Sequence, residues 1–496
     1  MKILLGLILG LSTFVVFAQQ CDSVQSCKPL AEQGDAAAQF HLGNLYQDGQ
    51  GVMRNDVEAA IWYRKAAMQG NADAQSALGW MLRRGLGVPQ NFKEALEWFH
   101  KAAGQNNLAA ITNIGWMHEK GLGVPRNYEK AMEWYHKAAD QNYAEAQNYL
   151  GWLYEKGMGA PRDFNKAFEL YRKASLKGLP AAQTNLAWMY RLGQGVPRNY
   201  AKAIYWFEKS AKQSYPAAMY YLAGMYNRGL GGPRDVQKAF DLYHQSAQLG
   251  YTRSQSMLGW MYRTGTGVPQ NYGLALEWFR KAAEKGDASA QTNLGWMYRH
   301  GVGLPQNFRL AHRWYLKAAD QNYAQAQYYI SWLYRKGLGV PQNHHLAVEW
   351  LRKAAMQGNV LAQTNLGWML RRGLGVPRDY ERALFWFRKA AMKNNPNAMT
   401  NLGWMYQQGL GMPIDNQAAF NWYRKASHLG DAEAQYYLAW MYRLGRGVEQ
   451  NSLMAYVWFN TAIGNGVKRQ DAKRLREEMY NVLTPEERAS ADRMSS

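Results

Sequence analysis

The residues best suited to binding chemistry are tryptophans, because all twenty of them occupy only two positions of a recurring 36-residue pattern. At one position, Arg often follows Trp three residues later, as Arg299 follows Trp296. Trp offers a large apolar plate, and Arg offers a fixed charge on a planar fork that fits carboxylate or phosphate. We therefore select as candidate ligand-binding residues Trp80, Trp116, Trp152, Trp188, Trp260, Trp296, Trp332, Trp368, Trp404 and Trp440, with Arg83, Arg191, Arg263, Arg299, Arg335, Arg371 and Arg443.

The same residues also have a purely structural interpretation. Arg and Trp could stack on each other, and on the next repeat, without binding a ligand. At about 100° per residue, Trp296 points roughly 150° away from the apolar stripe that contains Leu294 and Tyr298. That direction favours a surface, and we expect Thr292 to share it. Both interpretations stay open at this stage.

The second Trp position belongs to the other half of each unit, where most of the ten residues precede another aromatic side chain. We expect these tryptophans in the core: Trp62, Trp98, Trp134, Trp206, Trp278, Trp314, Trp350, Trp386, Trp422 and Trp458. Ten units carry a Lys near the end of the same helix, such as Lys65 and Lys281. A cation there favours the helix dipole, so we expect these lysines on a solvated outer face.

No pattern of residues indicates catalysis. The Gly-x-Gly triplets follow a helix rather than a strand, so the context of a dinucleotide-binding loop is absent. The ten His residues are mostly scattered, and no nucleophile–base pair or metal-ligand spacing stands out. We expect no catalytic residue, no cofactor and no metal site.

Internal repetition defines the elements that must position the tryptophans. A marker residue recurs every 36 residues with no insertion or deletion, at Gln39, Gln75, Ile111, Gln147, Gln183, Met219, Gln255, Gln291, Gln327, Gln363, Met399 and Gln435. Each unit encodes two helices: the first ends at a Gly such as Gly301, and a Pro such as Pro305 suits the start of the second.

Small residues at two repeat positions indicate close helix crossings. The position of Gly295 holds Gly, Ala or Ser in every unit, and the position of Ala311 is always Ala. Because neither helix can bury its apolar stripe alone, neighbouring units must stack. The sequence thus predicts an all-α fold, an α/α superhelical solenoid of twelve 36-residue helix-turn-helix repeats. We place these repeats at 39–470, an N-terminal cap at 19–38 and a C-terminal helical cap at 471–496, with a break near Pro485.

The first eighteen residues have the features of a signal peptide. Lys2 precedes an apolar run that is shorter than the roughly 20 residues of a bilayer span, and Ala18 offers a cleavage point before Gln19. The alternative is an uncleaved anchor; a lipoprotein is not favoured, because Gln20 precedes Cys21 where a small residue is needed. The rest of the chain has no apolar run long enough to span a membrane, so we expect a periplasmic or secreted protein.

The only two cysteines, Cys21 and Cys27, follow this segment directly. In an oxidising compartment such a close pair favours one local disulfide that staples the N-terminal end. The alternative is two free thiols. A further irregularity lies in the sixth unit, where Gly224 and Leu242 replace both tryptophans; this predicts a bend, or a gap between two binding stretches.

The unit A-x-A-Q-x-x-L-G-x-M-Y-x-x-G-x-G-V-P-x-x-Y-x-x-A-x-x-W-[YF]-x-K-A-A resembles that of the Sel-one-like repeat family, a branch of the tetratricopeptide-like solenoids. The resemblance runs from Gln39 to Gln470. It implies a superhelix that serves as an adaptor or scaffold and whose first helices line the concave surface. Some cysteine-rich relatives are linked to β-lactam binding; this chain has no cysteine in its repeats, which argues against that activity.

These observations favour a binding protein. Our leading hypothesis is a secreted scaffold that holds protein partners, such as envelope or host proteins, along its concave surface. The formal net charge of +21 favours anionic partners, so the alternative is an anionic envelope glycan such as peptidoglycan. Nucleic acid is not expected for a secreted chain, and a β-lactam-handling enzyme ranks last.

Overall fold

The computed structural model describes residues 21–495, and within this range the chain forms 27 helices and no strand. The proposed signal peptide, residues 1–18, lies outside the described residues. The first helices of the twelve repeats are α2 (Ala36–Asp48), α4 (Ala72–Arg84), α6 (Leu108–Lys120), α8 (Ala144–Lys156), α10 (Pro180–Leu192), α12 (Pro216–Arg228), α14 (Thr252–Thr264), α16 (Ala288–His300), α18 (Ala324–Lys336), α20 (Val360–Arg372), α22 (Pro396–Gln408) and α24 (Ala432–Leu444).

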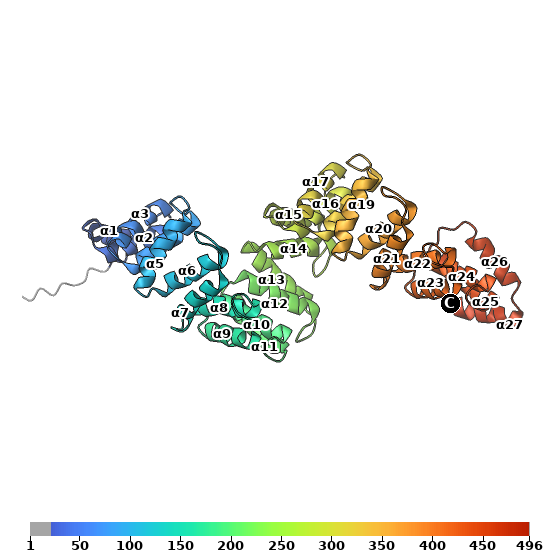
Figure 1. Cartoon of the computed structure of the whole chain (residues 1–496), viewed down its shortest axis with the longest axis horizontal. Coiled ribbons are helices and arrows are strands. Elements are labelled where there is room, and N and C mark those ends of the chain that lie inside the picture. The colour runs from blue at the N-terminus through green and yellow to red at the C-terminus, as the bar shows by residue number, and fades with distance from the viewer. Residues whose placement is uncertain (1–20, 496) are drawn as a thin grey trace, which may run out of the picture. The chain divides into compact units, whose positions relative to one another are not determined.

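With α13 set aside, each second helix packs against the first helix of its own repeat, and those from α3 to α23 also pack against the first helix of the next repeat (Figure 1). These second helices are α3 (Asp56–Met68), α5 (Phe92–Gly104), α7 (Tyr128–Ala139), α9 (Phe164–Leu176), α11 (Tyr200–Ala211), α13 (Val236–Gln248), α15 (Tyr272–Glu284), α17 (Phe308–Asp320), α19 (His344–Met356), α21 (Tyr380–Ala391), α23 (Asn416–His428) and α25 (Ser452–Gly464). The prediction of an all-α repeat fold is therefore confirmed.

The chain divides into two compact units, one up to Leu242 and one from Tyr243 onward. Each unit is a stack of helix pairs. The division falls inside α13, in the repeat that lacks both tryptophans. The bend or gap expected in this repeat stays a prediction.

Local sequence signals define both helices of a repeat, as the eighth unit shows. The Asp287 carboxylate accepts from the Ala290 N–H at 2.7 Å and caps the start of α16. The helix ends at Gly301, whose φ of +67° is a left-handed conformation that Gly adopts without a Cβ clash. The Asn307 side chain then accepts from the Leu310 N–H at 2.9 Å and starts α17. All twelve first helices end at such a Gly, as the sequence predicted.

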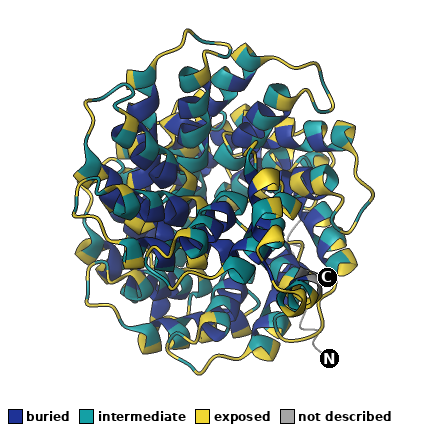
Figure 2. Cartoon of the chain, turned by 90° about the vertical axis from the view of Figure 1, so that its right-hand side faces the viewer, coloured by how far each residue is buried: buried dark blue, intermediate teal, exposed yellow. Residues whose placement is uncertain are grey.

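The core of each repeat is built around a close contact between its two helices. A Cβ on Gly295 would lie 2.6 Å from the Tyr315 ring, so only a bare backbone lets this ring approach α16. Tyr315 and Ala311 are both fully buried. The equivalents of Tyr315 are the largest fully buried side chains in most repeats, and Figure 2 shows the buried residues on the sides of the helices that face one another.

The second-helix tryptophans are less buried than the sequence led us to expect. The expectation is confirmed for Trp62 and Trp98, which are 6% and 8% exposed, but the other eight are partly exposed. The reason is geometric: the residue one place further on, such as Tyr315 beside Trp314, points straight at the first helix. The Trp lies at the edge of the core, and a Lys covers its face, as Lys281 covers Trp278 at 4.6 Å.

Short helices close both ends of the array. In the structure Cys21 and Cys27 are joined by a disulfide across the start of α1 (Val24–Glu32), and the Cys27 side chain is fully buried. At the other end, α26 (Ala472–Asn481) and α27 (Pro485–Ser495) follow the last repeat. Arg443 forms an ion pair with Glu478 of α26 at 2.9 Å. Among residues 21–495, no helix is both long and apolar enough to cross a membrane.

Candidate binding surface

In each of the two compact units, the Trp–Arg face is the surface formed by those of the ten first-helix tryptophans and seven arginines selected above that belong to that unit. None of these tryptophans is buried: Trp260 is 36% exposed and the other nine have intermediate exposure. All seven arginines have intermediate exposure as well. Each indole is thus partly covered, in several repeats by a cation of the preceding repeat.

Most arginines of this face stack on the tryptophan of the following repeat. The guanidinium carbon lies above the centre of the next indole ring in five pairs: Arg83 on Trp116 (4.3 Å), Arg263 on Trp296 (4.6 Å), Arg299 on Trp332 (3.6 Å), Arg335 on Trp368 (5.5 Å) and Arg371 on Trp404 (4.2 Å). Such cation–π contacts tie consecutive first helices together. They match the structural interpretation of these residues, while the partial exposure of both partners leaves surface for a ligand.

Two arginines stack on a Trp of their own helix instead, because the chain has no first-helix Trp one repeat further on. Arg191 stacks on Trp188 of its own helix at 4.3 Å, because the next repeat has Gly224 where a Trp would stand. Arg443 stacks on its own Trp440 at 4.8 Å, because the cap rather than another repeat follows. Each Arg of the face therefore stacks on the Trp of the next repeat where that Trp is present, and on the Trp of its own helix in these two cases.

In the third and fourth repeats, the position that holds Arg in seven other repeats is acidic. There Glu119 and Glu155 stand in place of Arg, and the buried Glu119 carboxylate accepts from the Tyr135 hydroxyl at 2.8 Å. The adjacent Lys120 lies over Trp152 at 5.5 Å instead. The longest uninterrupted run of stacked arginines thus belongs to the second compact unit, which begins at Tyr243. It consists of Arg263, Arg299, Arg335 and Arg371.

Three of the stacked arginines carry an unmet hydrogen-bond donor. The Nε atoms of Arg83, Arg263 and Arg371 are buried and have no hydrogen-bond partner. Burial lowers the pKa of all three guanidinium groups, and the neighbouring Arg372 lowers that of Arg371 further. A buried donor without an acceptor is costly, and an anion that met it would relieve that cost.

Sequence reasoning missed a position on this face, three residues before the Trp position, that is polar in most repeats although Ala77 and Met257 occupy it before Trp80 and Trp260. It holds Asn113, Asn185, Asn293, Asn365 and Asn401, or Tyr149, Tyr221, Tyr329 and Tyr437. The Asn293 Nδ2 donates to the Ser289 carbonyl at 2.9 Å, which leaves the amide oxygen as an acceptor. The helical spacing from Trp296 was the signal that could have revealed it.

The expectation for Thr292 was wrong. This residue is only 5% exposed, and its hydroxyl donates to the Ala288 carbonyl at 2.7 Å. Thr292 therefore packs between neighbouring helices, and the face presents Asn293 instead.

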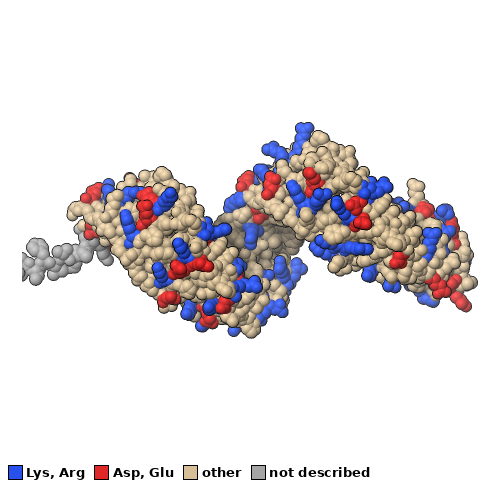
Figure 3. Space-filling view, viewed as in Figure 1, with Lys and Arg blue, Asp and Glu red and all other residues tan. Residues whose placement is uncertain are grey.

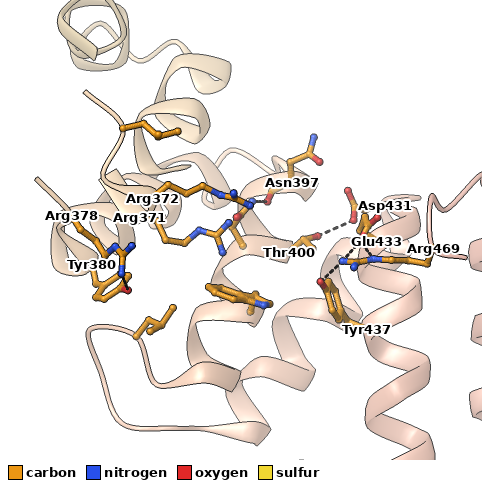
Figure 4. Close-up of a pocket in the computed structure, with 14 residues that line it drawn as sticks. Arg371, Arg372, Arg378, Tyr380, Asn397, Thr400, Asp431, Glu433, Tyr437 and Arg469 are labelled. Atoms are coloured by element: carbon orange, nitrogen blue, oxygen red, sulfur yellow. Dashed lines mark hydrogen bonds and ion pairs between the residues drawn. The ribbon is translucent and has the colours of Figure 1, made fainter. Parts of the chain in front are cut away.

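Three cavities lie along the Trp–Arg face, and each includes an Arg, a Trp and an Asn at equivalent repeat positions. Their volumes are 150 Å³ beside Arg83 and Trp116, 260 Å³ beside Arg335 and Trp368, and 710 Å³ beside Arg371 and Trp404. The largest lies within the range typical of small-ligand sites, and Figure 4 shows Arg371, Arg372 and Arg378 on one side of it, with Tyr437 and Arg469 on the other.

The surface charge of the chain is predominantly basic, with Lys and Arg outnumbering Asp and Glu by 58 to 37. Figure 3 shows basic residues spread over the visible face, with acidic residues between them. Among residues 21–495, no cluster of three or more His, Cys, Asp or Glu side chains is placed to hold a metal ion. The arrangement is suited to recognising extended anionic or amide-bearing ligands.

Comparison with known proteins identifies the repeat. The family model described as "Sel1 repeat" matches twelve consecutive 36-residue units, from 36–71 to 432–467, so each unit starts three residues before its marker. The comparison with curated proteins gives no match.

Two solved structures share the repeat at substantial identity. One is the Escherichia coli protein c5321, described as a protective antigen of uropathogenic strains with an SLR fold: it is 35% identical, covers 88% of this chain and 93% of its own, and has a TM-score of 0.66. The other is a Sel1 repeat protein from Oxalobacter formigenes: it is 34% identical, covers 62% of this chain and 90% of its own, and has a TM-score of 0.44.

Proteins built from such repeats generally mediate protein–protein interactions and are generally not enzymes. Both the twelve matched units and the likeness to c5321 extend over most of the chain. The chain therefore belongs to the Sel1 repeat family.

Proposed function

We propose that this protein is an exported scaffold that binds an extended segment of a partner protein along the Trp–Arg face. The observation that carries the proposal is the repetition of one arrangement, in which a half-exposed Trp is flanked by an Arg and an Asn. Each copy offers an apolar plate, a cation and an amide acceptor. A repeated surface of this kind follows an extended chain better than a compact small molecule.

The polar position supports a polypeptide as the ligand. The Asn293 and Asn401 amide groups donate to carbonyls of their own helices, which leaves their oxygens as acceptors. A peptide N–H is a natural partner for such an oxygen. The indole plates then provide the apolar contact that usually carries most of the binding energy at protein interfaces.

An anionic envelope glycan is the second candidate, and the basic charge favours it. The net charge of +21 attracts any anionic polymer. Glycan binding would grow with polymer length and weaken with salt, because its energy is spread over many repeats. A protein partner would instead depend on a few positions.

Photo-crosslinking in cells distinguishes the two candidates. A photoreactive phenylalanine derivative would replace Asn293, where equivalent repeats already carry an aromatic residue such as Tyr329. The matched control replaces Arg313, an exposed residue on the outer helix α17 whose equivalents include the exposed Phe385.

A discrete protein adduct from position 293 but not from 313 is the expected result. Adducts to glycan alone would favour the envelope polymer. Equal protein adducts from both positions, or none from 293, would contradict the use of the Trp–Arg face.

A further inference from the structure

The cavity shown in Figure 4 combines charges that occur together in one repeat only. Arg371, Arg372 and Arg378 all belong to the tenth unit, and no other unit has Arg at these three positions. The other units have Arg at two of the positions at most, as in the second, with Arg83, Arg84 and Gln90, and the fifth, with Arg191, Leu192 and Arg198. The feature is therefore specific to this cavity rather than a property of the repeat.

The three guanidinium groups lack carboxylate partners among the described residues. Arg371 stacks on Trp404 at 4.2 Å and Arg372 on Trp368 at 5.1 Å, while Arg378 donates to the Tyr380 hydroxyl at 3.3 Å. These are aromatic and neutral contacts. The buried Nε of Arg371 has no acceptor at all.

The two carboxylates of the cavity are already engaged. Asp431 accepts from the Ala434 N–H at 2.8 Å and from the Thr400 hydroxyl at 2.9 Å, so it caps α24. Glu433 forms an ion pair with Arg469 at 2.9 Å. Four arginines thus face two carboxylates, and the positive charge on the α20 side is uncompensated.

We infer that this cavity is a carboxylate-binding subsite that receives an acidic side chain of an extended peptide, an inference that rests on the proposed function. Arg372 and Arg371 would hold the carboxylate through charge-assisted hydrogen bonds, for which the planar guanidinium fork is well suited. Trp404 and Tyr437 line the same cavity and would contact the aliphatic part of the ligand.

The surroundings of the cavity favour a peptide as the carrier of the carboxylate. The adjacent 260 Å³ cavity, which contains Arg335 and Trp368, shares Asn397 and Asn401 with this one, so the two cavities are neighbours on the same face. The free oxygen of Asn401 suits a peptide N–H, whereas a phosphodiester supplies no donor for it. Packed helices lie about 8–10 Å apart, roughly three residues of an extended strand, so acidic residues at every third position would match successive arginines.

Fluorescence polarisation with the full-length protein tests this inference. The probe is a fluorescent peptide of four Glu-Gly-Ser repeats, and the comparison peptide has Gln in place of every Glu. The acidic peptide should bind in a salt-sensitive way, and the Gln peptide should bind at least about tenfold more weakly, because bonds to charged groups are lost.

Matched variants locate the site. Arg371→Gln/Arg372→Gln should weaken binding of the acidic peptide about tenfold or more. The control Arg313→Gln/Arg352→Gln removes two exposed arginines of the second helices α17 and α19, outside the Trp–Arg face, and should change binding less than about twofold. Thermal melting checks folding, and Arg378→Gln, at an exposed position, serves if the double variant unfolds.

Equal binding of both peptides, or equal losses in both double variants, would overturn the inference. Binding of an oligogalacturonate but not of the acidic peptide would overturn the assignment to peptide. If position 293 still crosslinks a protein while the acidic peptide fails to bind, the carboxylate subsite is contradicted and the proposed function stands. If position 293 gives no protein adduct and the acidic peptide does not bind, both proposals are contradicted.

Discussion

The guanidinium group of Arg299 lies 3.6 Å from the centre of the Trp332 ring, which belongs to the next repeat. This contact and its equivalents place one cation between consecutive indoles of the Trp–Arg face. The same residues therefore contribute to repeat stacking and remain partly available to a ligand. A binding surface and a stabilising contact are not exclusive here, because an aromatic ring has two faces and a guanidinium has several donors.

The Arg299–Trp332 contact should appear as a coupling energy in unfolding experiments. We expect Arg299→Ala and Trp332→Ala each to destabilise the protein, and the pair to show a coupling of about 1 kcal/mol. Urea unfolding of the two single variants and the double variant measures it. Arg299→Ala with Trp404→Ala is the control, since Trp404 stacks with Arg371 instead. Additive effects in the first pair would mean that the stacking has no energetic weight.

Helix packing at Gly295 should make a small substitution costly. Gly295→Ala would bring a Cβ to 2.6 Å from the Tyr315 ring, so we expect a loss of about 1–3 kcal/mol from overpacking. Gly104→Ala is the matched control, because Gly104 is also helical but has no packing partner within 4 Å of the position that a Cβ would occupy. That change should be neutral or stabilise by up to about 1 kcal/mol, since Ala favours helices. Thermal melting distinguishes the two, and equal shifts would contradict the packing argument.

Buried tyrosines should make the fold sensitive to alkaline pH. Burial raises the pKa of Tyr423 well above its ordinary value of 10.0. As the pH rises, the unfolded chain loses the Tyr423 proton at a lower pH than the folded chain does. The contribution of the protonated Tyr423 to the free energy of unfolding is therefore complete below about pH 10 and decreases above that pH. The loss is about 1.4 kcal/mol per pH unit for one such tyrosine.

Tyr423→Phe tests this contribution, and Phe387 shows that the position accepts Phe in another repeat. The variant loses the hydrogen bond to Gln407 at 3.1 Å, so it should be less stable at pH 7. Between pH 10 and 11, however, its unfolding free energy should fall less steeply than that of the natural protein. Parallel pH profiles would show that Tyr423 does not titrate on unfolding.

The Cys21–Cys27 disulfide should stabilise mainly the N-terminal end. Removing a short loop constraint costs about 2–3 kcal/mol in the chain-entropy model, and here the effect should be confined to α1 and its contacts with α2. Hydrogen exchange of reduced and oxidised protein would show faster exchange in α1 and unchanged protection in α24. Alkylation by iodoacetamide before reduction should modify neither cysteine; modification of both would show free thiols.

Much of the fold was predictable from residues that act locally. The 36-residue period, the left-handed Gly301 and the Asn307 cap depend on short stretches of chain, so each leaves a readable pattern. The small residue at Gly295 even indicated the helix crossing, although the partner, Tyr315, became clear only in the structure. The second-helix tryptophans were harder to place, because a shift of one residue along a helix rotates a side chain by about 100°.

The sequence by itself determined the repeat, its two helices and the residue types that each unit displays. Tertiary structure decided which Trp each Arg covers, that Thr292 turns inward while Asn293 faces outward, and that Arg371, Arg372 and Trp404 line one cavity. The Arg–Trp contacts between repeats join residues about 33 positions apart. They depend on how one helix packs against the next, and no pattern within a single unit carries that information.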